Sequence, residues 1–185
     1  AMNYLASGNA PGRLGNAHPN IVPYEAFPTA DGYLILAVGN DSQFKSFCAV
    51  AGLGALPLDE RYATNRKRVA NRDELVPLIR QAMVGKTTDQ WIDALEKANV
   101  PCGPINTLDR VFENPQVKHR GIVKQLDHPT AGTVPTVANP IKFSKTPITD
   151  EKAPPMLGQH SDEILRKVAD LSDDQIAKLR EAGIV

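Results

Sequence analysis

A short polar loop carries the residues best placed for chemistry. It consists of Gly39, Asn40, Asp41, Ser42 and Gln43, and it joins an apolar run to a segment with helical periodicity. Backbone N–H groups at a helix N-terminus can bind an anion or stabilise a developing oxyanion, and glycine lets the backbone approach a ligand closely. The same pattern also fits a plain strand-to-helix connection in which Asp41 or Ser42 caps the helix.

The histidines favour structural roles over metal binding. Their spacing matches no metal-ligand pattern, so the sequence predicts no metal site. We interpret His18 and His160 as residues that make structural polar contacts, the second at a helix start. The four histidines are His18, His119, His128 and His160.

A basic cluster between residues 61 and 72 offers a second candidate site, because clustered cations bind phosphate groups. Acidic residues interleave with it, however, and a charge-mixed segment is usually a solvated face. We therefore favour the solvated face. The basic residues are Arg61, Arg66, Lys67, Arg68 and Arg72.

The elements that position the polar loop follow from the apolar pattern. Residues 21–27 predict a strand that Pro23 interrupts, and residues 33–38 predict a buried strand covered on both faces. Behind the loop, apolar residues at helical spacing predict a helix that ends near Gly52.

Polar start signals predict three further helices. Capping boxes begin at Asn71, Thr87 and Ser172, and Pro77 should kink the first of these helices or delay its start. Residues 1–20 are predicted to form a loop. Strands are expected at 102–106, 122–127 and 133–137, a short helix at 107–114, a helix at 161–169 and an extended proline-rich stretch at 139–156.

Composition excludes several classes of partner. Lys plus Arg and Asp plus Glu number 21 each, so nucleic acid is not an expected partner. No apolar run approaches the length of a membrane span, and no membrane partner is expected. The two cysteines, Cys48 and Cys102, have no ligand-like spacing, and the chain starts without a signal-peptide pattern. A cytoplasmic location is the prediction.

Five strings in order along the chain resemble the family III CoA-transferases, the group that includes formyl-CoA transferase and carnitine CoA-transferase. The match extends from the first residues to the last, and the string Val-Pro-Cys-Gly-Pro is particularly telling. The strings occupy residues 15–24, 31–44, 100–105, 114–117 and 157–165.

The resemblance implies an α/β fold, namely the small α/β domain of such an enzyme plus its C-terminal return segment. The resemblance also implies that the N-terminal Rossmann-like half of the family is absent from this chain. By analogy, residues 1–20 are an interdomain connection, residues 21–114 the small domain, and residues 115–185 a return segment that packs on the large domain. Family members form interlocked homodimers.

The resemblance also implies a reaction. The family moves CoA from an acyl-CoA donor to a small carboxylic acid, through an aspartyl anhydride and an enzyme thioester. The CoA thioester is a substrate, and no covalently bound cofactor is expected. The nucleophilic aspartate should precede Ala1, so no catalytic residue is assigned here and the fragment itself should be inactive. Residues Gly39 to Gln43 correspond to a loop that closes over the active site.

Two alternatives stay open. The 2-methylacyl-CoA racemase branch of the superfamily places a glutamate in the corresponding loop, where this chain has Asn40, Asp41 and Ser42 but no glutamate. The chain could also work as a noncatalytic interaction module. The sequence does not name the acid or the CoA donor.

Overall fold

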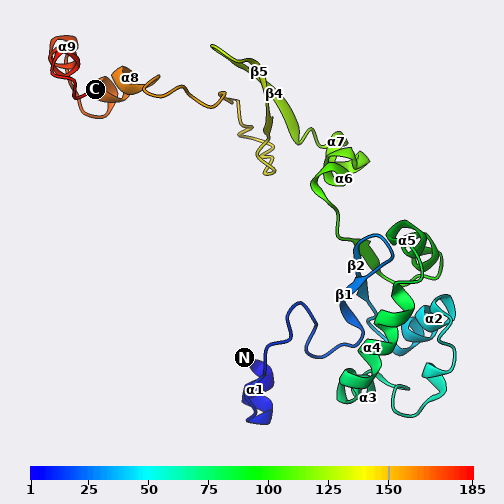
Figure 1. Cartoon of the computed structure of the whole chain (residues 1–185). Helices are drawn as coiled ribbons and strands as arrows, with labels where there is room; N and C mark the ends of the chain where they lie inside the picture. The colour runs from blue at the N-terminus through cyan, green and yellow to red at the C-terminus, as the bar shows by residue number, and fades with distance from the viewer. Residues whose placement is uncertain (150) are drawn as a thin grey trace. The chain divides into compact units, whose positions relative to one another are not determined.

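The computed structural model describes residues 1–149 and 151–185. The chain forms two compact units, Ala1–Thr107 and Leu108–Val185. Figure 1 colours them from blue to green and from green to red. The division at Thr107 lies ahead of the boundary at residue 114 that the family resemblance implies.

The first unit contains a three-stranded antiparallel sheet of order β1-β2-β3. Its strands are β1 (Tyr24–Pro28), β2 (Tyr33–Ala37) and β3 (Cys102–Pro104). β2 falls within the strand predicted at residues 33–38 and is the central strand of the sheet. The predicted burial of β2 on both faces is wrong for the described residues: Leu34 and Leu36 are fully buried, whereas Tyr33 on the other face is 54% exposed. An antiparallel sheet can bury one face only.

Two helices of the first unit follow the predicted pattern closely. α2 (Asp41–Ala51) buries Phe44, Phe47 and Cys48 on one face and ends at Gly52, whose φ of 71° is left-handed. α5 (Thr88–Lys97) begins with the predicted capping box, in which the Thr87 and Gln90 side chains bond each other's backbone N–H groups. Both helices thus present an apolar stripe to the core.

The segment between these helices differs from the prediction. It forms the 3-10 turn η1 (Leu56–Leu58), α3 (Asn65–Ala70) and α4 (Arg72–Met83). α4 continues through Pro77, and Asn71 makes no capping bond, so the predicted capping box there is wrong. The reason is competition, because the Asn71 amide donates to the carbonyls of Arg61 and Lys67 instead. The N-terminal segment contains an unpredicted exposed helix, α1 (Met2–Ser7).

The main hydrophobic core lies within the first unit. It draws on the sheet, on α2, α4 and α5, and on the turn before α3, and the Trp91 indole N–H donates to the Met83 carbonyl at 2.6 Å. The largest fully buried apolar side chains are Trp91, Tyr62, Phe27, Phe44, Phe47, Leu34, Leu36, Leu75, Ile79, Met83 and Leu95.

The second unit consists of short helices and one hairpin. α6 (Leu108–Glu113) and α7 (Pro115–His119) precede the antiparallel hairpin of β4 (Val123–His128) and β5 (Gly132–Val137). α8 (Ser161–Lys167) and α9 (Asp173–Glu181) follow, and Ser172 opens α9 with the predicted capping box. Among the described residues of this unit, Ile176 is the one buried hydrophobic side chain.

Candidate functional site

The loop of residues 39–43 leaves β2 and enters α2, as the sequence predicted. Asn40 is the helix cap: its side-chain oxygen accepts from the Gln43 N–H at 2.9 Å and from the Ser42 hydroxyl at 2.7 Å. The prediction that Asp41 or Ser42 is the cap is therefore wrong. Asp41 is the first helical residue, and the Ser42 hydroxyl donates to the Asn40 side chain.

The loop is closed by its own side chains. The Gln43 side-chain oxygen accepts from the Gly39 N–H at 2.8 Å. Gly39 has no left-handed backbone angle, and a Cβ added there would lie 3.3 Å from that same oxygen. A substituted Gly39 therefore displaces the Gln43 side chain first. Backbone strain plays no part at this position.

The Asp41 carboxylate contacts two neighbouring groups through one of its oxygens. One of its oxygens accepts from the Asn65 N–H at 2.9 Å and lies 2.9 Å from the Arg68 Nη2. Asp41 therefore acts as an anchor between the start of α2 and the start of α3.

Arg68 is fully buried beneath the loop. Its Nε donates to the Val22 carbonyl at 2.7 Å and its Nη1 to the Tyr62 carbonyl at 3.1 Å. Nη2 makes the ion pair with Asp41 without the alignment of a hydrogen bond, and the guanidinium lies 4.4 Å from the centre of the Phe44 ring. Burial lowers the pKa of Arg68, and the Asp41 carboxylate opposes that shift.

Arg68 thus fits neither interpretation of the basic cluster. It does not lie on a solvated face, and its buried donors are turned toward the protein's own carbonyls. The sequence did not reveal this role, because Arg68 follows two other cations, Arg66 and Lys67, and nothing in that run distinguishes a buried cation from exposed ones. Helical spacing offers no signal for it, because Val69, the half-buried residue of α3 that packs against the core, is adjacent to Arg68 rather than three or four residues away.

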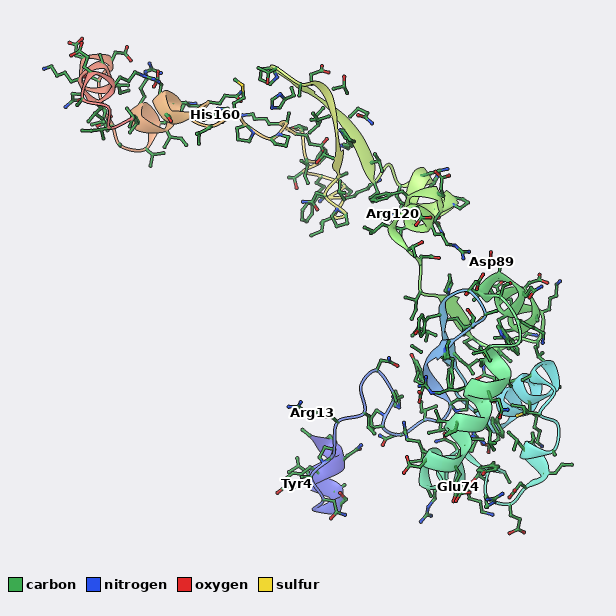
Figure 2. The ribbon with its side chains drawn as sticks, viewed as in Figure 1. Tyr4, Arg13, Glu74, Asp89, Arg120 and His160 are labelled. Carbon is green, nitrogen blue, oxygen red and sulfur yellow. The ribbon has the colours of Figure 1, made fainter. Side chains whose placement is uncertain are left out.

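Arg61 and Arg72, two other cations of the cluster, contact nearby groups. Arg61 forms ion pairs with Asp59 at 2.8 Å and with Glu74, labelled in Figure 2, at 2.6 Å. Arg72 donates to the His18 carbonyl at 2.6 Å. These contacts are those of a charge-mixed surface, and they favour the solvated-face interpretation for Arg61.

The two histidines singled out from the sequence lie far apart in the chain. The His18 ring stacks on Tyr24 with a centroid distance of 5.2 Å, and its Nδ1 accepts from the Asn20 N–H at 3.1 Å. His160 precedes α8 without capping it by its side chain, and its Nδ1 lies 3.5 Å from a Glu163 oxygen. No cluster of three potential metal ligands occurs among residues 1–149 and 151–185.

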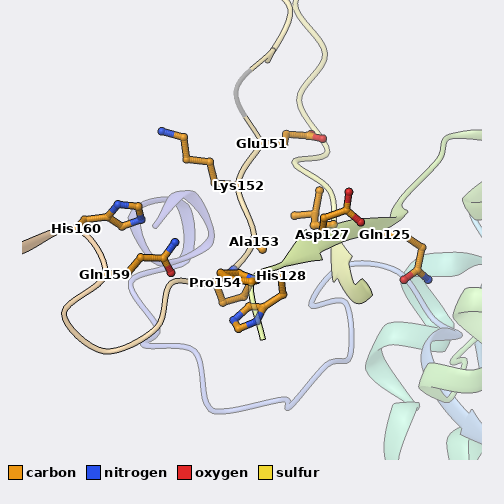
Figure 3. A pocket seen from close by; sticks show the side chains of 11 residues that line it. Gln125, Asp127, His128, Glu151, Lys152, Ala153, Pro154, Gln159 and His160 are labelled. Carbon is orange, nitrogen blue, oxygen red and sulfur yellow. The ribbon is translucent and has the colours of Figure 1, made fainter. Parts of the chain in front are cut away.

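A cavity of about 670 Å³ lies within the second unit, and the sequence did not predict it. Figure 3 shows its lining side chains, which come from the end of β4 and from residues 151–160. His128 lines it, but its Nδ1 accepts from the backbone N–H groups of Thr130 and Ala131 and so closes the β4–β5 turn. Glu151 lines it as well and is paired with Lys124.

The chain matches the model of CoA-transferase family III over residues 1–161. It belongs to that family, as the strings at residues 15–24 and 31–44 indicated. In the part of the chain that the structure describes, no helix is long and apolar enough to span a membrane.

Individual relatives are similar over nearly the whole chain. Succinate–glutarate CoA-transferase of Agrobacterium fabrum is 47% identical over 90% of this chain and 42% of the relative. Human succinyl-CoA:glutarate CoA-transferase is 39% identical over 100% of this chain and 42% of its own length. The crystal structure of a CAIB/BAIF family protein from Brucella suis superposes with a TM-score of 0.75, at 44% identity, over 88% of this chain and 42% of that one. The chain thus spans less than half the length of these relatives.

Proposed function

We propose that this chain is the C-terminal portion of a CoA-transferase that moves CoA from an acyl-CoA donor to a carboxylic acid. The observation that carries the proposal is the family match over residues 1–161, together with relatives named as CoA-transferases at 47% and 39% identity. Because these two relatives are named for glutarate and for succinate or succinyl-CoA, we propose short dicarboxylates as the acids. CoA enters only as a substrate thioester.

The proposed chemistry is nucleophilic catalysis by a carboxylate. An aspartate oxygen attacks the thioester carbonyl, the C–S bond breaks, and CoA leaves as a thiolate. The thiolate then attacks the aspartyl carbon of the mixed anhydride, which releases the donor acid and leaves an enzyme thioester. The acceptor carboxylate repeats both steps in reverse order.

The attacking aspartate is proposed to lie ahead of Ala1. Three carboxylates of the first unit are occupied by other groups, which supports that assignment. Asp41 pairs with Arg68, Asp59 pairs with Arg61, and Asp31 accepts from the backbone and hydroxyl of Thr88. A carboxylate that accepts such bonds in its resting position is poorly placed to attack a thioester.

The loop of residues 39–43 is proposed to cover the reacting thioester in the full-length protein. A mixed anhydride is hydrolysed by water, so the site has to exclude it. The polar, self-bonded loop supports this role because its exposed Gly39 and Asn40 present a backbone without a bulky side chain. We propose in addition an interlocked homodimer in the cytoplasm, with residues 115–185 packed on the large domain.

The racemase alternative is the weaker one on this geometry. It needs a carboxylate in the loop that is free to accept a proton next to a thioester carbonyl. Asp41 is the loop's carboxylate, and it is held by Arg68 and by the Asn65 N–H.

The test is a CoA-exchange assay on the full-length protein that contains this chain. Succinyl-CoA is supplied with glutarate, oxalate or no acid, and the acyl-CoA products are measured by mass spectrometry. We expect glutaryl-CoA from the full-length protein and none from the 185-residue chain alone. Transfer by the chain alone, lost on substitution of one of its own residues, contradicts the proposal. Epimerisation of a 2-methylacyl-CoA without transfer would favour the racemase, and neither activity would favour the interaction module.

A further inference from the structure

The buried guanidinium of Arg68 joins three segments that are distant in the sequence. It bonds the carbonyl of Val22, which precedes β1, and the carbonyl of Tyr62, which precedes α3. Its third group faces Asp41 at the start of α2. The planar guanidinium directs its donors at such partners in fixed directions, whereas a lysine ammonium is a compact charge on a flexible stem.

Asn65 reinforces the same junction. Its side-chain oxygen accepts from the Val22 N–H at 3.1 Å, and its amide donates to the Asn20 carbonyl at 2.8 Å. Its own N–H donates to Asp41. The segment that arrives at β1 and the first residue of α2 are therefore tied to α3 by two independent sets of bonds.

This junction divides the loop into a held part and an exposed part. Asp41 is fixed from beneath, and Phe44 is buried under the Arg68 guanidinium. Gly39 and Asn40 are exposed. Gly39 is bonded by the Gln43 side chain, and the Asn40 side chain is bonded by the Ser42 hydroxyl and the Gln43 N–H. Any motion of the loop must therefore be confined to the two residues ahead of Asp41.

We propose that Arg68 is a positioning residue for the transfer reaction. Through Asp41 it fixes the loop of residues 39–43 in the position in which the loop covers the thioester. The inference rests on the proposed function of the loop. Arg68 does not touch substrate, because its side chain is fully buried. Its effect reaches the reaction through the placement of the exposed backbone of Gly39 and Asn40, and a displacement of about 1 Å is enough to slow an oriented reaction strongly.

Two variants separate the contribution of the Arg68–Asp41 ion pair from that of the packing around it. Asp41→Asn removes the ion pair but keeps an oxygen for the Asn65 N–H, and the Asp41 side chain is 48% exposed, so the variant is expected to fold. The double variant Asp41→Asn/Arg68→Met removes both charges and leaves no unpaired buried cation. Asp93→Asn is the matched control, because it removes a carboxylate from the exposed Lys97–Asp93 pair on α5.

The first readout needs no activity and uses the 185-residue chain. Amide hydrogen exchange at Gly39 and Gln43 is expected to become roughly tenfold faster in both variants and to stay unchanged in Asp93→Asn. Unchanged exchange at these two amides in the folded double variant would overturn the anchoring, whatever the enzyme does.

The second readout uses the full-length protein. We expect kcat for transfer to fall roughly tenfold or more with little change in KM for the acyl-CoA, and the ratio of hydrolysis to transfer to rise. A purely structural role would lower the melting temperature and leave that ratio at the parent value, which would overturn the positioning role. If the unsubstituted full-length protein transfers no CoA, the proposed function fails, and the positioning role for transfer falls with it. The exchange data then still decide whether Arg68 anchors the loop.

Discussion

At the scale of single residues, polar side chains decide the local geometry of the loop. Asn40, Asp41 and Ser42 can all cap a helix, and composition alone does not distinguish them. Asn40 takes the role because the Asp41 carboxylate is drawn to Arg68, a contact between residues 27 positions apart. The sequence predicted the loop and the helix after it. It did not predict that Asn40 caps the helix while Asp41 pairs with Arg68, because these roles depend on tertiary contacts.

The capping assignment predicts an order of stabilities. Asn40→Ala should lower the free energy of unfolding by about 1 kcal/mol, because the Gln43 N–H loses its acceptor. Ser42→Ala should cost less, because its hydroxyl only donates to Asn40. Urea denaturation of the chain followed by circular dichroism measures both. A larger loss for Ser42→Ala than for Asn40→Ala would contradict the assignment.

The Cys48 thiol should not react with alkylating reagents in the native protein. Burial raises the pKa of its thiol to about 12, although the nearby Arg68 charge opposes the shift. Since the thiolate is the reactive form, iodoacetamide at pH 8 should leave Cys48 unmodified until the protein is unfolded. Peptide mapping by mass spectrometry provides the measurement, with the less buried Cys102 as internal comparison. Modification of native Cys48 as fast as Cys102 would show that the first unit opens readily.

At the scale of elements, patterns of period and capping predicted most of what the structure contains. The central strand β2, the buried face of α2 and the capping boxes of α5 and α9 are confirmed. The errors arise where a tertiary contact overrides a local signal. Asn71 bonds carbonyls of the preceding segment and so leaves α4 without a side-chain cap, and α4 accommodates Pro77.

The connection between the β1–β2 turn and α5 predicts a pH dependence. Asp31 accepts from the Thr88 N–H at 2.7 Å and from the Thr88 hydroxyl at 2.9 Å, and these bonds lower its pKa below the ordinary value of 3.8. The ionised group therefore contributes stability that is complete above pH 3.8 and is lost as the pH falls through the lower folded pKa.

Asp31→Asn tests this dependence. The variant should be less stable than the parent at neutral pH, and the difference in melting temperature should shrink as the pH is lowered below 3.8. Thermal unfolding of both proteins between neutral and strongly acidic pH gives the measurement. A difference that stays constant over this range would mean that the charge of Asp31 does not stabilise the turn.

At the scale of the whole molecule, the two units differ in how much apolar surface they bury. The core cluster lies between Val22 and Val100, while many large hydrophobic side chains of the second unit remain exposed, including Phe143, Leu157 and Val168. We propose as the reason that this unit is a return segment suited to packing on another domain.

The difference predicts unequal protection in the isolated chain. Amides of β2, α2 and α5 should exchange most slowly, because their hydrogen bonds open only when the core does. Amides of residues 139–149 should exchange fastest, since this stretch forms neither helix nor strand. Hydrogen exchange with mass spectrometry resolves these segments. Equal protection throughout would mean that the chain is one self-sufficient domain.

We propose that the chain serves a CoA-transferase whose nucleophile lies outside these 185 residues. The most direct measurement is to incubate the full-length protein with succinyl-CoA, quench it, and locate the covalent CoA or acyl adduct by peptide mass spectrometry. We expect an adduct on an aspartate in a peptide that precedes Ala1. An adduct on Asp31, Asp41 or Asp59 would contradict it.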